Sequence, residues 1–488
     1  MEQTNKRNTL ALISIMLGAF ISLLDTTIVN VALPDITTAL HATSETIEWV
    51  ISGYALAFGL VLILAGRLGD KFGRKNIYII GITLFLIMSV TAGFADSENS
   101  LIISRVIQGL AAGLFFPQIN ATIMDMYSGK SLGKIFGILG SVIGVGTAIG
   151  PLTGGLLIEL FGTTNGWRAV FFVNVPFVLV TLVLAMLYLP KRTVSTKKIS
   201  FDLPGVGLLT IALLLLLFPL ISNGANDFKP IDYLLMALSI PLFIILYKWS
   251  VYQEKKGNQP LIAPNLLKNN QFVSGMLLSL VYFAAFTSIF FVLSLTWQTG
   301  FNRSAILSGL AISPFALGSV LAASNSYRLI PILGRKLLML GVALVIIGLG
   351  TVSIVFHLND GAFSAWLLFL PLFIAGIGSG LTIAPLNSFT LSTVTGVDRG
   401  GASGMFNTAQ RIGSSFGIAV VGSVFFRTLG NTAATSKASA FSDSLQMSMY
   451  VNIVLLVVCF LLVFRLPKNN LKKRHDFALK SCLFSYAK

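Results

Sequence analysis

The chain consists of long apolar segments separated by short polar loops. About 20 apolar residues cross the hydrocarbon core of a bilayer, and fourteen segments of this sequence are long enough. They predict an all-α membrane protein, because a helix satisfies its own backbone hydrogen bonds in lipid. The predicted spans are 9–33, 46–66, 76–95, 101–124, 133–158, 167–189, 203–222, 231–251, 272–298, 304–327, 334–357, 363–391, 402–428 and 447–466.

The composition leads to the same conclusion. Of the 488 residues, 55% are hydrophobic and 11% are charged, whereas a soluble domain has about 25% charged residues. A single soluble core could not bury that much apolar surface. The first apolar segment is too long for a signal-peptide core and lacks a small-residue cleavage site, so we expect it to be retained as a helix.

The loops on one side of the predicted membrane are strongly basic. This side, called the basic face below, carries both termini and 27 of the 34 Lys and Arg residues. By the positive-inside rule both termini are predicted to be cytoplasmic, in a multi-pass protein of the plasma membrane. The net charge of +16 then reflects topology. A nucleic-acid interface is not expected, because the basic residues are scattered over many short loops.

The sequence repeats weakly at an offset of 267 residues. Gly109 and Asn120 in the fourth span match Gly376 and Asn387 in the twelfth, and several glycines of the fifth and thirteenth spans match in the same register. Repeats of this kind place a substrate cavity at the bilayer midplane between two halves. The predicted domains are an N-terminal six-helix half (1–190), two inserted helices (191–264), a C-terminal six-helix half (265–466) and a basic cytoplasmic tail (467–488). We expect the inserted pair to be a lipid-facing spacer.

Three charged residues lie inside predicted spans and away from the span ends. Asp25 is deep in the first, Arg105 in the first part of the fourth and Arg411 in the thirteenth. Such residues are costly in lipid and are functional candidates. Burial opposes ionisation of a carboxylic acid and a nearby cation favours it, so Asp25 could take up a proton on one side and release it on the other. We expect it to interact with Arg105 during a proton cycle. The alternatives are that Arg105 snorkels to the surface and that Arg411 is a gate or packing residue.

The loop after the second span reads Gly-Arg-Leu-Gly-Asp-Lys-Phe-Gly-Arg-Lys from Gly66 to Lys75. Its charges alone could be a positive-inside anchor. The loop resembles the signature G-x-L-x-D-x-x-G-R-K of the major facilitator superfamily. The resemblance implies that Asp70 faces a helix N-terminus near Gly400 and that Arg74 pairs with Asp125. The latch residues implied in this way are Gly66, Asp70, Gly73, Arg74 and Asp125.

The corresponding loop of the second half lacks the acidic residue. It keeps Gly334, Arg335 and Lys336 but has Pro331 where the aspartate would stand. We therefore expect only one working latch.

The fifth span is rich in glycine. Gly146, Gly150 and Gly154 share one helix face, where another helix can approach closely, and Pro151 permits a bend. Together with Gly155 they form G-x-x-x-G-P-x-x-G-G. Packing alone could explain the glycines, but the motif resembles the signature of antiporters within the same superfamily.

The stretch 105–109 (R-x-x-Q-G) resembles a signature of the superfamily that is linked to proton transfer. Two further stretches, 24–34 (L-D-x-T-I-V-N-V-A-L-P) and 167–176, resemble the fourteen-helix drug/proton antiporters of that superfamily. The resemblance implies a major facilitator fold and proton-coupled efflux of amphiphilic drugs or toxic compounds by alternating access, with Asp25 as the exchange carboxylate. The proton-coupling residues are Asp25 and Arg105, and the expected substrate-cavity residues are Asp25, Asn30, Tyr54, Gln108, Asn387, Asn407 and Arg411.

The predicted tenth to thirteenth spans contain no acidic residue. With Arg411 among them, the cavity should suit neutral, zwitterionic or monocationic amphiphiles better than dications. The expected partners are this small substrate, protons and the lipid bilayer, and the expected state is a monomer.

Other functions are weaker or remain open. An exporter of a lipid, glycolipid or endogenous metabolite is the main alternative, and a nutrient uniporter or symporter is disfavoured by the Gly-Pro motif. An ATP-driven pump is disfavoured because no G-x-x-x-x-G-K-[ST] motif occurs; the closest stretch has Met124 at its first glycine position. No metal or cofactor is expected, and the sequence shows no nucleophile constellation of an enzyme.

Overall fold

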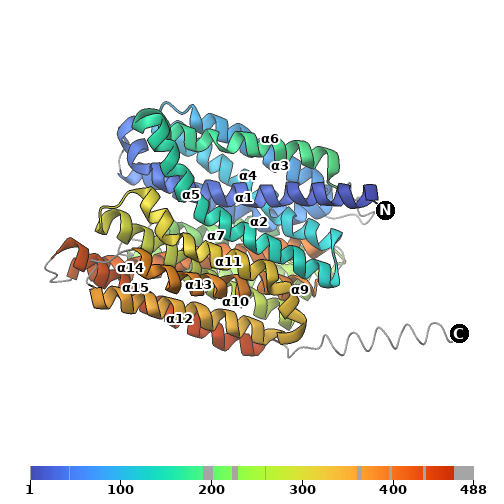
Figure 1. Cartoon of the computed structure of the whole chain (residues 1–488). Helices are drawn as coiled ribbons and strands as arrows, with labels where there is room; N and C mark the ends of the chain where they lie inside the picture. The colour runs from blue at the N-terminus through green and yellow to red at the C-terminus, as the bar shows by residue number, and fades with distance from the viewer. Residues whose placement is uncertain are drawn as a thin grey trace.

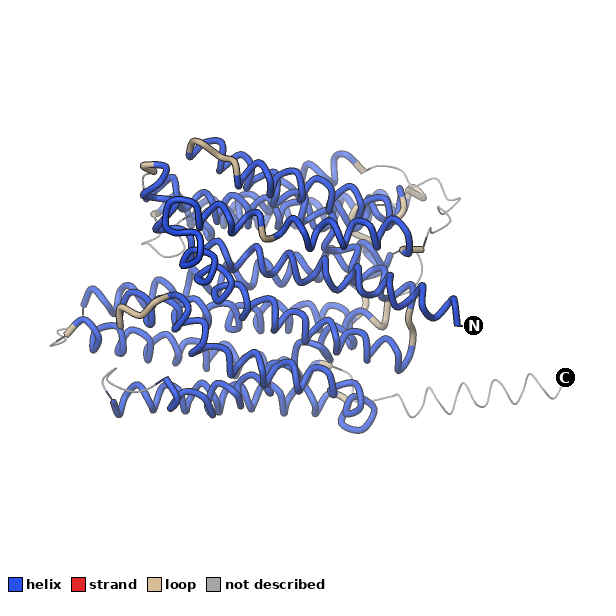
Figure 2. Tube along the Cα trace, turned by 45° about the horizontal axis from the view of Figure 1, so that its top comes forward, coloured by secondary structure: helices blue, strands red, loops and turns tan. Residues whose placement is uncertain are grey.

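The computed structural model describes residues 2–42, 44–190, 202–222, 229–258, 260–359, 365–394, 398–431 and 436–466. The predicted tail and most of the loop before the inserted helices lie outside this part. The described residues form helices joined by short loops, with no strand among them (Figure 2). Fourteen helices there are long and apolar enough to cross a membrane, so the predicted number of spans and the all-α class are confirmed.

The helices run in the order of the predicted spans. They are α1 (Glu2–Leu40), α2 (Ser44–Phe72), α3 (Arg74–Gly93), α4 (Glu98–Met126), α5 (Gly129–Phe172), α6 (Asn174–Tyr188), α7 (Leu203–Ser222), α8 (Pro230–Lys255), α9 (Pro264–Lys268), α10 (Asn270–Leu295), α11 (Ala305–Leu333), α12 (Arg335–Asn359), α13 (Phe369–Leu391), α14 (Arg399–Asn431) and α15 (Lys437–Leu462). Short turns flank three of them, namely η1 (Thr296–Gly300), η2 (Ala365–Leu368) and η4 (Val463–Arg465).

Several helix ends differ from the predicted spans. Helix α1 continues to Leu40 and α15 begins at Lys437, because backbone hydrogen bonding extends beyond the apolar stretch that hydropathy detects. The loop predicted between the fifth and sixth spans is a break at Gly162 (φ 73°, ψ 166°) inside α5. The sixth span therefore begins in the last part of α5 and continues through α6. The short helix α9 was not predicted.

The two sets of six spanning helices repeat one packing pattern. Helix α4 packs against α2 and α3 as α13 packs against α11 and α12, and α1 packs against α5 and α6 as α10 packs against α14 and α15. Figure 1 shows α1–α6 (blue to green) grouped above α11–α15 (yellow to red). The pattern agrees in its register with the 267-residue sequence offset.

Glycines bring the two sets of helices together along α5 and α11. A Cβ atom at Gly137 would lie 2.6 Å from the carbonyl oxygen of Ala323, and one at Gly155 would lie 2.7 Å from Ile306. These two glycines are eighteen residues apart, which is about 27 Å along a helix. The helices are therefore in contact over much of the membrane thickness, and bulkier residues would force them apart.

The inserted helices are not equivalent. Helix α7 packs against α2 of the first half and α14 of the second, whereas α8 packs mainly against α7. The Leu217 side chain fills the space beside Gly59, and the rings of Phe218 and Trp49 lie 5.8 Å apart. Helix α7 thus covers the seam between the halves. Only α8 fits the expectation of a peripheral spacer.

Candidate functional site

Asp25 lies at the centre of a fully buried polar cluster. Its carboxylate accepts hydrogen bonds from Arg105 Nη1 at 2.7 Å, Gln108 Nε2 at 3.1 Å and Asn174 Nδ2 at 2.8 Å. Asp25, Gln108 and Asn174 are 0% exposed and Arg105 is 1% exposed. A buried charge is tolerated only when it is paired and hydrogen-bonded, and this carboxylate is both. The cluster joins α1, α4 and α6.

Arg105 points into the bundle. Its Nε donates to the carbonyl oxygen of Val50 at 3.2 Å, and its guanidinium carbon lies 4.2 Å from the centroid of the Tyr54 ring. The guanidinium also donates to Gln108 Oε1 at 2.7 Å. The alternative that Arg105 snorkels to the membrane surface is therefore wrong, and the structure places Arg105 beside Asp25 as the sequence analysis expected.

Asn174 was not among the sequence candidates, although it belongs to the stretch 167–176 that was singled out. Its Nδ2 bonds both Asp25 and Ser89 Oγ, at 2.8 and 3.1 Å. Ser89 in turn donates to the carbonyl oxygen of Phe171. An asparagine in the middle of an apolar span is itself a signal of a buried polar partner, and it could have been used to find this residue.

The other expected cavity residues are distributed differently. Tyr54 is buried between Arg105 and Phe58, whereas Asn30 is exposed, five residues beyond Asp25 on α1. Arg411 is partly exposed, with its guanidinium carbon 4.0 Å from the centroid of the Phe58 ring. Only Tyr54 and Gln108 of the expected cavity set lie against the Asp25–Arg105 pair.

Asn407 takes part in a polar contact between the halves instead of facing Asp25. Its Oδ1 accepts from Asn120 Nδ2 at 3.3 Å, and the nearby Ser403 hydroxyl donates to the carbonyl oxygen of Pro117 at 2.8 Å. Both contacts join α4 to α14. Asn387 on α13 is buried, and among the described residues no hydrogen bond joins it to the Asp25 cluster.

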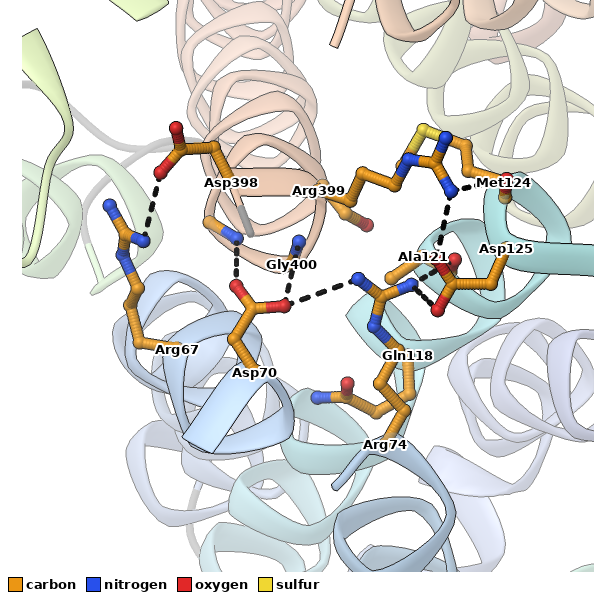
Figure 3. Close-up of polar contacts among 12 residues, drawn as sticks. Arg67, Asp70, Arg74, Gln118, Ala121, Met124, Asp125, Asp398, Arg399 and Gly400 are labelled. Atoms are coloured by element: carbon orange, nitrogen blue, oxygen red, sulfur yellow. Dashed lines mark hydrogen bonds and ion pairs between the residues drawn. The ribbon is translucent and has the colours of Figure 1, made fainter. Parts of the chain in front are cut away.

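Asp70 lies under the N-terminus of α14 (Figure 3). The backbone N–H groups of Gly400 and Gly401 donate to its two carboxylate oxygens, each at 3.3 Å, and Arg74 Nη2 lies 3.2 Å from Oδ1. Unpaired N–H groups and the helix dipole favour a carboxylate at this position by about 0.3–1 kcal/mol at exposed sites. The contact expected for Asp70 is present, and it joins the two halves.

Arg74 and Arg399 share Asp125 at the end of α4. Arg74 Nη1 donates to Asp125 Oδ2 and to the carbonyl oxygen of Ala121, and Arg399 Nη1 lies 2.9 Å from Asp125 Oδ1. The first pair was expected from the sequence. Arg399 was not, because its approach depends on how the second half docks against the first.

A second ion pair that the sequence did not indicate lies beside the latch. Arg67 Nη1 is 3.2 Å from Asp398 Oδ1, and Arg67 Nε donates to the carbonyl oxygen of Leu261 at 2.7 Å. Leu261 follows the inserted helices, and its N–H bonds Asp202, which precedes α7. Three arginines and three aspartates thus meet at the basic face (Figure 3).

The glycines of the latch permit close approach. A Cβ atom at Gly66 would collide with the carbonyl group of Gly400, and Gly73 has a φ of 91° at the turn between α2 and α3. A side chain at either position would be strained. In the second half, Arg335 donates to the carbonyl oxygens of Phe464 and Leu466 within its own half, so no equivalent cross-half latch occurs among the described residues there.

The glycine face of α5 packs against α1 close to Asp25. A Cβ atom at Gly146 would lie 3.1 Å from the Leu23 side chain, one at Gly154 would lie 3.0 Å from the Ile28 carbonyl oxygen, and one at Gly150 would overlap Thr27. The helix continues through Pro151 without a break, whereas Gly155 faces Ile306 of the second half. Helix α5 therefore contacts both the acidic helix α1 and the opposite half.

This packing predicts a stability loss for Gly150→Ala. Because the added Cβ atom would overlap Thr27 and lie 3.1 Å from the backbone nitrogen of Ile28, we expect a loss of about 1–3 kcal/mol, the usual effect of overpacking, measured as a lower unfolding temperature in detergent. Gly350→Ala on α12 is the matched control, since a Cβ atom there meets nothing within 4 Å. Equal unfolding temperatures for the two variants would contradict the close packing of α5 on α1.

No group of three or more His, Cys, Asp or Glu residues that could hold a metal ion occurs within the described ranges. The geometry instead combines two helical halves, a cluster of charges that joins them at one face, and a buried acid in the first half. This arrangement of paired helical sets is the one found in secondary transporters.

The sequence matches the Major Facilitator Superfamily over residues 15–418 and 275–481. The chain belongs to this superfamily and is a multi-pass transporter rather than an enzyme.

Similar proteins include two that are named for transport or export of a particular compound. The chain is 33% identical over 432 residues to the probable actinorhodin transporter of Streptomyces coelicolor, covering 87% of this chain and 74% of the relative. It is 28% identical over 434 residues to the tetracenomycin C resistance and export protein of Streptomyces glaucescens, covering 88% and 78%. The structure of the proton:xylose symporter XylE superposes with a TM-score of 0.67 at 15% identity, covering 95% of this chain and 97% of that one. This last similarity shows the fold alone.

Proposed function

We propose that the protein exports amphiphilic drugs or toxic compounds in exchange for protons, by alternating access. The observation that carries the proposal is the Asp25–Arg105 pair at 2.7 Å, fully buried within the membrane-spanning bundle. A buried acid next to a buried cation can exchange a proton with a large effect on its surroundings, because protonation leaves the cation unpaired. The relative named for tetracenomycin C resistance and export supports the cargo class and the direction.

Protonation of Asp25 would change the contacts of three helices at once. It removes the charge that holds Arg105 on α4 and Asn174 on α6, while Asp25 itself sits on α1. Helix α1 packs on the glycine face of α5, and α5 lies along α11 of the other half. A shift of α1 would therefore be transmitted to the contact between the halves. Since Asp25 is 0% exposed here, the substrate affects it through this rearrangement and need not contact it directly.

The ion pairs and hydrogen bonds between the halves at the basic face favour the state in which that face is closed. With the basic face cytoplasmic, Asp70 and its partners close the cytoplasmic side, and the opposite side is the one from which protons enter. The energy available is about 2.3 kcal/mol per charge for each 100 mV and about 1.4 kcal/mol for each pH unit. This is comparable to the energy of a few buried polar contacts.

Aromatic side chains of the second half suit an amphiphilic cargo. On α10 and α11, Phe286, Phe290 and Phe315 form a ring cluster with centroids 5.0–6.1 Å apart. Phe290 is partly exposed. Aromatic rings of this kind are common in ligand pockets because they offer large apolar contacts with little loss of entropy.

The direct test is dye efflux from proteoliposomes under an imposed pH gradient. We expect accumulation or release of rhodamine B to follow the gradient and to stop when an ionophore collapses it. Transport that ignores the gradient would contradict the proton-coupled exchange. Liposomes without protein provide the leak rate, which matters because amphiphilic dyes cross bilayers slowly unaided.

An exporter of one endogenous compound is the second candidate. It is favoured by relatives that are named for a single compound, actinorhodin or tetracenomycin C. Growth of a null strain against dyes, quaternary ammonium compounds and fluoroquinolones separates the two. Sensitivity to several unrelated classes supports multidrug efflux, and an unchanged profile supports the dedicated exporter.

A further inference from the structure

Arg411 is a membrane-embedded cation that pairs with no acidic residue in the described part of the chain. It lies twelve residues after Arg399 on α14, which is about 18 Å along the helix, and hence near mid-membrane. None of the ion pairs or hydrogen bonds found in the described part of the chain involves its side chain. An unpaired cation in this environment is costly and is normally matched by a ligand or pathway.

The Arg411 side chain reaches across the seam to aromatic rings. Its guanidinium carbon lies 4.0 Å from the centroid of the Phe58 ring and 5.9 Å from that of Phe116, and both rings belong to the first half. The side chain is partly exposed. A guanidinium stacked on a ring in this way keeps its N–H edge free for a planar acceptor, and the stacking compensates only part of the lost hydration.

The acid of the first half is not available to balance this charge. Asp25 is already paired with Arg105 at 2.7 Å. The rings of Tyr54 and Phe58, 5.9 Å apart, lie between Arg105 and Arg411 as successive contacts. The centre of the bundle therefore holds one more positive than negative charge among the residues named here.

We propose that Arg411 binds a carboxylate of the transported compound, while Phe58 and Phe116 contact its aromatic or apolar part. The planar guanidinium matches a carboxylate in a bidentate pair, and the ring beside it provides an apolar surface continuous with the charge. The inference rests on the proposed function and specifies its substrate class. It narrows the expected neutral, zwitterionic or monocationic amphiphiles to zwitterionic ones and adds anionic ones.

The test compares two dyes that differ at one carboxyl group. Rhodamine B carries a free carboxylate, and rhodamine B ethyl ester has the same ring system with that charge blocked. Binding to the purified protein in detergent is measured by fluorescence anisotropy at equilibrium. We expect wild-type protein to prefer the free acid, and Arg411→Gln to weaken its binding about tenfold, equivalent to about 1.4 kcal/mol, with little change for the ester. Arg411→Lys should fall between.

Arg427→Gln is the matched control, because Arg427 lies on the same helix but is exposed near its end. It should bind both dyes as wild type does. Equal weakening of both dyes in Arg411→Gln, an unchanged preference, or a wild-type protein that does not prefer the acid would overturn the proposal. If Arg411→Gln does not fold, Arg411→Lys decides by the same comparison. Because no gradient is needed, a failure of proton-driven efflux contradicts the proposed function without affecting this result.

Discussion

Asp25→Asn is expected to reduce proton-driven dye efflux to the leak rate of liposomes without protein. Asparagine keeps the shape and can still bond Gln108 and Asn174, but it cannot carry the charge that pairs with Arg105 or exchange a proton. Efflux is measured in proteoliposomes with an imposed pH gradient. Exchange of dye across the membrane without a gradient should persist, because rearrangement of the halves does not itself require the proton.

The control for this variant must separate loss of coupling from loss of folding. Removing one partner of a buried ion pair costs about 3–5 kcal/mol, so Asp25→Asn is also expected to lower the unfolding temperature. The double variant Asp25→Asn/Arg105→Gln removes both charges and should regain part of that stability. If it also regained proton-driven efflux, the pair would be structural and the proposal would fail.

Asp35→Asn provides the matched acid. Asp35 lies on the same helix, ten residues beyond Asp25, which is about 15 Å away along the axis, and outside the membrane-spanning part. Burial raises the pKa of its carboxyl above the usual value, so it is a second acid on α1 that could titrate. Efflux near the wild-type rate in Asp35→Asn is the expected result. If Asp35→Asn lost as much efflux as Asp25→Asn, Asp25 could not be identified as the residue that carries the proton.

The helices could be predicted well from the sequence because each span must itself be apolar enough to lie in the lipid. Hydropathy measures a local property, and Asp25, Arg105 and Asp70 stand out because charge within or beside an apolar span has few explanations. The partners were harder to predict. Asn174 and Arg399 bond aspartates that lie 149 and 274 residues away in the chain. Only the packing of the helices decides which polar side chains come into contact.

The exposure of the polar residues also could not be predicted. Asn30 and Asn407 are both asparagines within predicted spans, yet Asn30 is exposed and Asn407 is 2% exposed at the seam. The difference depends on which face of each helix meets the other half. For the same reason the sequence placed Arg411 in a cavity without indicating that its neighbours would be aromatic rings instead of acids.

Asp70→Asn, a change in the latch, is expected to shift the equilibrium between the two states of the transporter. The substitution removes the charge that faces the N–H groups of Gly400 and Gly401 and one of the two carboxylates that pair with Arg74. A loss of about 1–2 kcal/mol of closure energy shifts the two states by a factor of about 5–30. We therefore expect the basic face to open and the opposite face to close more often.

This shift can be measured by labelling a cysteine at position 30. Asn30 is exposed in the present conformation and Cys459 is buried, so Asn30→Cys in a chain with Cys482 replaced gives one reactive site. A membrane-impermeant maleimide is applied from the side opposite the basic face. Labelling should become several-fold slower in Asp70→Asn than in the parent.

Two further variants show whether close approach of the halves, and not charge alone, holds the basic face shut. Gly66→Ala leaves every charge in place but puts a Cβ atom against the Gly400 carbonyl group, so it should slow labelling as Asp70→Asn does. Asp398→Asn removes a pair that is 31% exposed on the acid side, where solvent weakens the attraction, and should have a smaller effect. The labelling rate could instead depend only on the number of charges removed, with Gly66→Ala labelled as fast as the parent. In that case the contact between the halves would be electrostatic without a steric requirement. The glycines of the loop would then need another explanation.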